Sequence, residues 1–181
     1  MGTIKTTNIE TISGSGTLTI GTSGETIALG TGVVQSNMLY PAFKVTLSGD
    51  QTINDNTTTK ITFDTETFDT DSAFASNKFT VPASEGGKYN IISQLTFYDA
   101  SDQITKVVLA IYKNGGAITE AIYNLSSEDF GRYALCNSNV LALSASDYIE
   151  IYGYADTSDG GTIAILSGNQ QSYFSGYKIG T

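Results

Sequence analysis

Hydrophobic and polar residues alternate along most of the chain after residue 41. One long alternating run spans residues 89–98. Its two sides hold different residue types: Tyr89, Ile91, Leu95 and Phe97 on one, and Asn90, Gln94 and Thr96 on the other. Successive side chains of a β-strand point to opposite faces of a sheet, so this run predicts a long central strand. Pro82 and Gly86-Gly87, just before it, predict a turn that separates it from an earlier strand.

Other runs of the same kind predict further strands on both sides of this one. They lie at residues 43–47, 60–63, 104–113, 117–124, 132–143, 148–154, 162–166 and 172–179. Lys113-Asn-Gly-Gly116 separates two of them and predicts a hairpin, because Asn-Gly readily adopts positive φ. The acidic run 64–71 is expected to form a strand end and a loop. Eight to ten short strands without helical periodicity predict an all-β, two-sheet sandwich.

Residues 1–40 form a distinct segment that is rich in Gly, Ser and Thr. Apolar residues recur nine positions apart in it, at Ile9, Leu18 and Ile27 and again at Ile20 and Leu29. The repeat predicts a quasi-linear β-structure, and so few residues cannot enclose a core alone. Sharing the core among several chains around an axis would give a trimeric stalk; a flexible linker is the alternative. We therefore divide the chain into a stalk, 1–40, and a globular head, 41–181.

Composition narrows the classes of partner. The net charge of −9 argues against nucleic-acid binding and against docking on an anionic membrane. No apolar run approaches the length of a membrane span, so we expect no membrane insertion. The start of the chain lacks the charged-then-apolar pattern of a secretion signal. We expect a product that is made in a reducing cytoplasm.

Two residue types are scarce or missing. The chain has no His, which excludes a His-based catalytic triad and a histidine metal site. Its single Cys136 excludes an intrachain disulfide and a multi-thiolate zinc site. We expect Cys136 to be a small buried residue on a strand. No enzymatic activity is predicted.

Six spaced residues carry a family resemblance: Phe63, Asp69, Phe74, Phe79, Gly87 and Tyr89. They resemble the signature of the C1q/TNF-like domain, and the likeness extends from about residue 41 to 180. It includes the closing run Phe174-Ser-Gly-Tyr-Lys-Ile179. The resemblance implies a ten-stranded jelly roll that assembles as a homotrimer, with its first and last strands side by side.

Two acidic clusters are candidate sites. Asp64, Glu66, Asp69 and Asp71 are interpreted as a solvated rim, with a calcium site or glycosidic catalysis as the alternatives. Some C1q-like trimers bind calcium, so the resemblance makes Asp156 and Asp159 possible calcium ligands. An ordinary glycine-rich turn is the alternative there. No other cofactor is predicted.

Tyrosines on the polar sides of the predicted strands are the other candidates. Tyrosine suits subunit contacts and sugar stacking because it has an apolar face and a polar tip. Tyr98, Tyr173 and Tyr177 are assigned to the trimer interface. Tyr152 and Tyr154 are assigned to an outward binding surface, and Tyr112 belongs to the same set of exposed-face aromatic residues.

The combination of stalk and head indicates a function. The segment Ile9-Glu-Thr-Ile-Ser-Gly-Ser-Gly-Thr-Leu-Thr-Ile20 resembles the start of short fibre proteins of tailed bacteriophages, especially marine ones. The resemblance implies a virion structural protein that joins other virion proteins through its N-terminal segment. Its head would project to meet a host receptor or glycan. The alternatives are a purely architectural virion protein, a polysaccharide-degrading spike and an exported bacterial adhesin.

Overall fold

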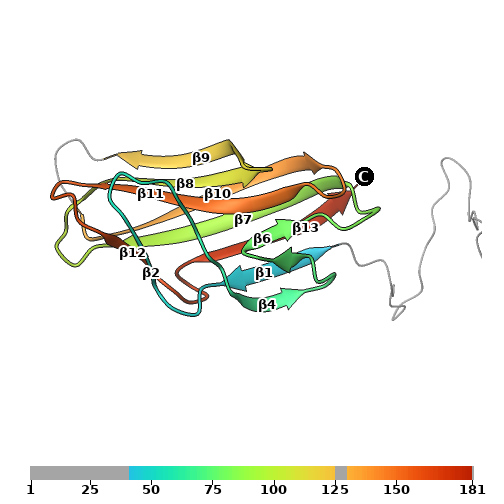
Figure 1. Cartoon of the computed structure of the whole chain (residues 1–181), viewed down its shortest axis with the longest axis horizontal. Coiled ribbons are helices and arrows are strands. Elements are labelled where there is room, and N and C mark those ends of the chain that lie inside the picture. The colour runs from blue at the N-terminus through green and yellow to red at the C-terminus, as the bar shows by residue number, and fades with distance from the viewer. Residues whose placement is uncertain (1–40, 125–129, 181) are drawn as a thin grey trace, which may run out of the picture. The chain divides into compact units, whose positions relative to one another are not determined.

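The computed structural model describes residues 41–124 and 130–180, which form two antiparallel β-sheets (Figure 1). The strands are β1 (Ala42–Thr46), β2 (Gln51–Ile53), β3 (Thr59–Lys60), β4 (Thr65–Asp69), β5 (Phe74–Ala75), β6 (Lys78–Thr80), β7 (Gly87–Tyr98), β8 (Ile104–Lys113), β9 (Gly116–Asn124), β10 (Arg132–Leu143), β11 (Tyr148–Thr157), β12 (Ile163–Ile165) and β13 (Tyr173–Gly180). These residues contain no helix, and therefore none that is long and apolar enough to cross a membrane. The stalk predicted at 1–40 lies outside the described residues.

The first sheet, sheet A, is organised around β7. Strand β10 pairs with β7 over its whole length, and β13 and β12 pair with the other edge of β7. Beyond them lie β1 and β4 on β13, and β2 on β12. The pairing of β1 with β13, from Ala42↔Tyr177 to Thr46↔Tyr173, confirms that the first and last strands of the head lie side by side.

The second sheet, sheet B, has the order β5-β6-β11-β8-β9, with β3 on the free part of β11. Strands β8 and β9 form the predicted hairpin. Its turn places Asn114 at φ 53° and Gly115 at φ 82°, which are the positive values that an Asn-Gly turn requires.

Gly87 also has a specific role, because a Cβ there would collide with the carbonyl oxygen of Gly180.

The core lies between the two sheets and explains the spaced aromatic residues. Phe43 from β1 stacks on Phe79 from β6 at 4.5 Å and meets the edge of Phe174 from β13 at 4.8 Å. All three rings are at most 1% exposed. Asp69, the polar residue of the motif, accepts a hydrogen bond from the backbone N–H of Phe74 at 2.7 Å. The motif therefore joins the two sheets and orients the turn that precedes β5.

Three details differ from the sequence-based prediction. The described residues contain thirteen strands rather than eight to ten, because several pairings are only two or three residues long. The strand predicted at 60–63 is limited to Thr59–Lys60, although Ile61 and Phe63 are fully buried. The acidic run 64–71, expected to be a strand end and loop, contains β4 because Thr65–Asp69 pairs with β1.

Candidate functional sites on the two outward faces

The outward surface of β1, β13, β7 and β10 is the first candidate, and we call it face A. Cross-strand register gives its residues, which include Lys44, Asn90, Ile92, Gln94, Tyr98, Cys136, Val140, Tyr173, Ser175 and Tyr177. The three tyrosines predicted for a subunit interface thus lie on one face. Tyr98 and Tyr177 are exposed, and Tyr173 is half-buried with the Lys44 ammonium 5.2 Å from its ring centre.

Face A carries no carboxylates on its strands. None of the residues of β1, β7, β10 and β13 is Asp or Glu, although the chain has 18 acidic residues and a net charge of −9. A second negatively charged copy would be repelled by carboxylates at a contact. Their absence leaves this face electrostatically suited to self-association.

Four polar side chains of face A, those of Asn90, Gln94, Ser138 and Tyr177, are already hydrogen-bonded. Ser138 donates to the side-chain oxygen of Asn90 at 3.3 Å, and the amide nitrogen of Asn90 donates to the Tyr177 hydroxyl at 3.2 Å. The amide nitrogen of Gln94 donates to the carbonyls of Gln170 and Gln171 at 3.1 and 3.0 Å. Covering polar groups that already have partners costs less than covering unpaired ones.

Cys136 corrects one expectation. It was predicted to be buried, but it is exposed on face A, because β10 turns its even-numbered residues outward and its odd-numbered ones toward the core. Burial, and secondarily the nearby Cys136, raises the pKa of Tyr173, so that this phenol stays neutral at physiological pH. A free thiol therefore lies among the tyrosines predicted for the subunit interface.

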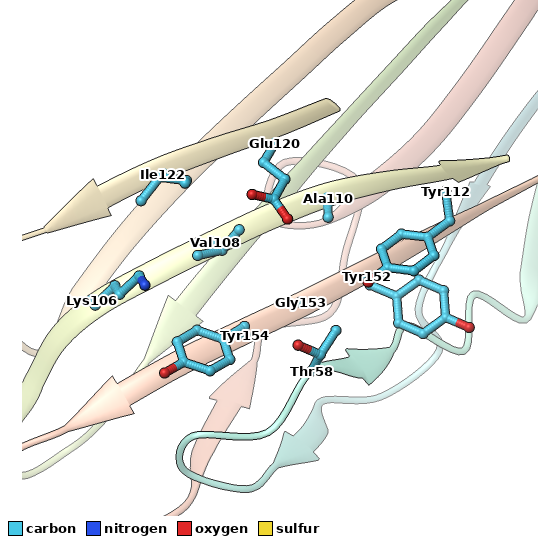
Figure 2. Close-up of a pocket in the computed structure, with 10 residues that line it drawn as sticks. All are labelled: Thr58, Lys106, Val108, Ala110, Tyr112, Glu120, Ile122, Tyr152, Gly153 and Tyr154. Atoms are coloured by element: carbon cyan, nitrogen blue, oxygen red, sulfur yellow. The ribbon is translucent and has the colours of Figure 1, made fainter. Parts of the chain in front are cut away.

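The second candidate is a hollow of about 270 Å³ on the outward surface of sheet B, which we call hollow B (Figure 2). It is lined by Thr58, Lys106, Val108, Ala110, Tyr112, Glu120, Ile122, Tyr152, Gly153 and Tyr154. Ala110 lies in β8 between two larger neighbours, Tyr152 in β11 and Glu120 in β9. The small alanine side chain between them leaves the space.

Tyrosines border hollow B, and each is held in place. The rings of Tyr112 and Tyr152 lie 4.0 Å apart at 31°. Tyr154 donates a hydrogen bond to the side-chain oxygen of Asn56 at 2.7 Å, and the ammonium of Lys106 lies 5.2 Å from its ring centre. Figure 2 shows Tyr154 and the Tyr112–Tyr152 pair at opposite ends of the hollow. Tyr152 and Tyr154 thus face outward from β11, on the side opposite the core.

Burial raises the pKa of Tyr152 and of Tyr154 on β11. Nearby carboxylates add to the effect: Glu150 beside Tyr152, and Asp156 and Asp55 beside Tyr154. Both phenols are therefore neutral hydrogen-bonding groups at physiological pH. Sequence analysis did not find Thr58, Lys106, Ala110 or Glu120, because only the pairing of β8 with β9 and β11, and of β3 with β11, brings them to these tyrosines.

The acidic cluster at 64–71 serves mainly to hold turns. Asp64 accepts hydrogen bonds from the backbone N–H and the hydroxyl of Ser48 at 2.8 and 2.6 Å, and these bonds lower its pKa. Asp69 holds the backbone of Phe74, as described above. Asp64, Glu66 and Asp71 are exposed. This placement agrees with the interpretation as a solvated rim.

The proposed calcium ligands lie in and beside the loop that follows β11. Asp159 is exposed and accepts a hydrogen bond from the backbone N–H of Gly161 at 2.9 Å. Asp156 lies in β11 opposite Lys106. Within residues 41–124 and 130–180, no group of three or more Cys, Asp or Glu side chains is arranged to hold a metal ion. Calcium binding at Asp156 and Asp159 stays a prediction.

Comparison with known proteins gives a likeness of fold. No protein-family model and no curated protein sequence matches the chain. Among solved structures, the globular domain of zebrafish complement 1qA matches with a TM-score of 0.53 and 15% identity, over 77% of this chain and 97% of that one. Murine APRIL at pH 5.0 matches with a TM-score of 0.57 and 12% identity, over 77% of this chain and 99% of that one. The Eiger TNF of S. frugiperda matches with a TM-score of 0.57 and 14% identity, over 78% of this chain and 92% of that one.

The head has a C1q/TNF-like jelly-roll fold. This confirms the fold class that the six spaced residues predicted. The share of each matched structure that is covered, 92% or more, shows that the head corresponds to a whole domain of this type. At 12–15% identity the likeness concerns fold alone, and function has to be argued from the two faces.

Proposed function

We propose that this chain is a bacteriophage virion structural protein, a homotrimeric appendage whose C1q/TNF-like head projects from the particle and attaches to the host surface. Residues 1–40 would join it to other virion proteins. Hollow B, which faces away from the proposed subunit contact, would be the surface that meets the host.

The observation that carries the trimer is the character of face A. Val140, Asn90 and Tyr177 form one row across β10, β7 and β13, and two of them are large exposed apolar or aromatic side chains. Exposed apolar patches of this kind commonly mark protein contacts. The absence of acidic residues from the four strands of face A supports a contact with another copy of this negatively charged chain. Self-association there agrees with the homotrimer that the family resemblance implies.

Assignment to a virion is supported by the N-terminal sequence. The nine-residue apolar repeat and the run at residues 9–20 resemble the attachment segments of short phage fibres. A trimer would present three copies of hollow B on the same assembly. Several weak contacts of this kind give strong adhesion through avidity, without tight binding at any single site.

Two measurements test this proposal. Light scattering of the full chain should give a single species near three times 19.2 kDa; a monomer would overturn the trimer. Particles whose copy of this protein lacks residues 42–181 should assemble and fail to adsorb to the host. Fragile particles that still adsorb would favour the architectural alternative, and a particle that never contains the protein would overturn the virion assignment.

A further inference from the structure

We infer that hollow B is a binding site for an uncharged saccharide, with one pyranose ring seated over Ala110 between the tyrosines. The inference names the ligand class of the attachment surface and rests on the proposed function for its biological role. The binding itself depends only on the residues of sheet B.

The size and the shape of hollow B fit one small ring. Pockets for drug-sized ligands measure roughly 300–1,000 Å³, and hollow B lies just below this range at about 270 Å³. Its floor is apolar, because it is formed by the outward side chains of Val108 and Ala110. Tyrosines stand at its two ends (Figure 2). Aromatic faces at the ends of an apolar floor suit the C–H faces of a sugar ring.

Three polar side chains surround this floor, and two of them make no hydrogen bond or ion pair within the described part of the chain. Glu120 in β9 and the hydroxyl of Thr58 make no hydrogen bond or ion pair with the described residues, and they lie on opposite sides of the hollow (Figure 2). Lys106 contributes three donors beside Tyr154. A carboxylate that accepts, an ammonium that donates and a hydroxyl that does both match the neighbouring hydroxyls of a sugar. On face A, by contrast, Asn90 is bonded to both Ser138 and Tyr177.

Charge selects an uncharged sugar. Lys106 is the only cation among the described residues that line hollow B, and Asp156 lies opposite it in β11. The neighbouring Lys60 is already paired with Glu150 at 2.6 Å. With Glu120 at the rim and a net charge of −9 on the chain, an anionic sugar would be repelled.

The experiment that tests this inference is saturation-transfer NMR on the full chain with single sugars. The probes are the methyl glycosides of glucose, galactose, mannose and N-acetylglucosamine, with glucuronic acid and sialic acid as anionic counterparts. At least one neutral glycoside should bind with a millimolar dissociation constant, the usual range for a single weak site. Glu120→Gln should weaken binding about tenfold, because the charged acceptor is lost. Glu66→Gln, which removes the same charge from an exposed position on β4, should leave binding unchanged.

An aromatic pair of variants separates a binding role from a structural one. Tyr154→Ala should weaken binding about fivefold through loss of the ring face, whereas Tyr154→Phe should bind nearly as the wild type does. Absence of binding by every neutral glycoside, tighter binding of the acids, or equal affinity of Glu120→Gln and wild type would overturn the inference. Single sugars bind without avidity, so the result is independent of assembly. A monomer that binds would contradict the trimer only, and an adsorbing trimer that does not bind would contradict the saccharide only.

Discussion

Face A and hollow B are both outward surfaces of antiparallel sheets that share one core, and they differ in the hydrogen bonding of particular polar side chains. On face A, Asn90 is bonded to Ser138 and Tyr177 within the surface, and the strands carry no carboxylate. At hollow B, Glu120 and Thr58 have no partner among the described residues. A surface whose polar groups are already paired can be covered by another protein at low cost. A surface whose polar side chains have no protein partner can instead offer them as hydrogen-bonding groups to a small polar ligand.

The largest effect is expected from a change in the core, on which face A and hollow B both depend. Phe43→Ala removes the ring that stacks on Phe79 and contacts Phe174 between the sheets. Loss of a fully buried phenylalanine costs about 3–5 kcal/mol, so stability, assembly and sugar binding should all decline together. Chemical denaturation measures the loss. A variant that kept wild-type stability would show that the two sheets do not depend on this aromatic cluster.

A carboxylate on face A should separate the two surfaces. Val140→Glu places like charges at each subunit contact, and we expect the mass to fall from about three times 19.2 kDa to that of one chain. Ile122→Glu is a matched control, because Ile122 is 51% exposed on sheet B and Val140 is 55% exposed on sheet A. The control should remain trimeric. Light scattering measures the mass of both variants. A trimeric Val140→Glu variant would show that the subunit contact lies elsewhere.

Acid should weaken the end of sheet B beside Asp147. Lys113 and Asn114 bind the Asp147 carboxylate at 2.8 and 2.7 Å, and with the Ser144 N–H they lower its pKa to about 2 from 3.8. Because the folded pKa is the lower one, this contribution to stability is complete above about pH 4 and is lost as the pH falls toward 2.

The variant Asp147→Asn tests this origin of the acid sensitivity. We expect it to lose roughly 1 kcal/mol of stability at neutral pH and to show a shallower decline between pH 4 and 2 than the wild type. The decline should not vanish, because hydrogen bonds also lower the pKa of Asp50 and Asp64. Lys113→Met, which removes the ion-pair partner, should reproduce the shallower decline in thermal unfolding. Parallel curves for wild type and variant would exclude Asp147 as a cause.

The smallest effect is one of access. Cys136 is exposed on face A of a single chain and would be covered in the trimer. A thiol reagent should therefore react with the wild-type protein at least about tenfold more slowly than with the Val140→Glu chain if the proposed trimer forms, because thiol reactivity depends on access. Ile122→Glu should react at the slow rate. Equal rates for all three proteins would mean that Cys136 lies outside the subunit contact.

Much of the fold was predictable, and less of the candidate sites. The alternation at 89–98 and the Asn114-Gly115 turn report local geometry, so the long strand and the hairpin were found correctly. Tyr152 and Tyr154 were placed outward by the same alternation. The burial expected for Cys136 was wrong, since residue type alone does not tell which side of a strand faces the core. Glu120 gave no signal, because an exposed glutamate in an alternating strand looks like any solvated residue.

The sequence by itself determined the longer strands, the inward sides of those that alternate regularly and the C1q/TNF-like framework, because each depends on residues close together in the chain or on a spaced core motif. Only the tertiary structure decided which outward sides meet. Cross-strand register seats Ala110 between Tyr152 and Glu120 and thereby opens hollow B. Sheet order brings four acid-free strands, far apart in sequence, into one surface. Pairing between distant segments depends on the packing of the whole core, and no local pattern records it.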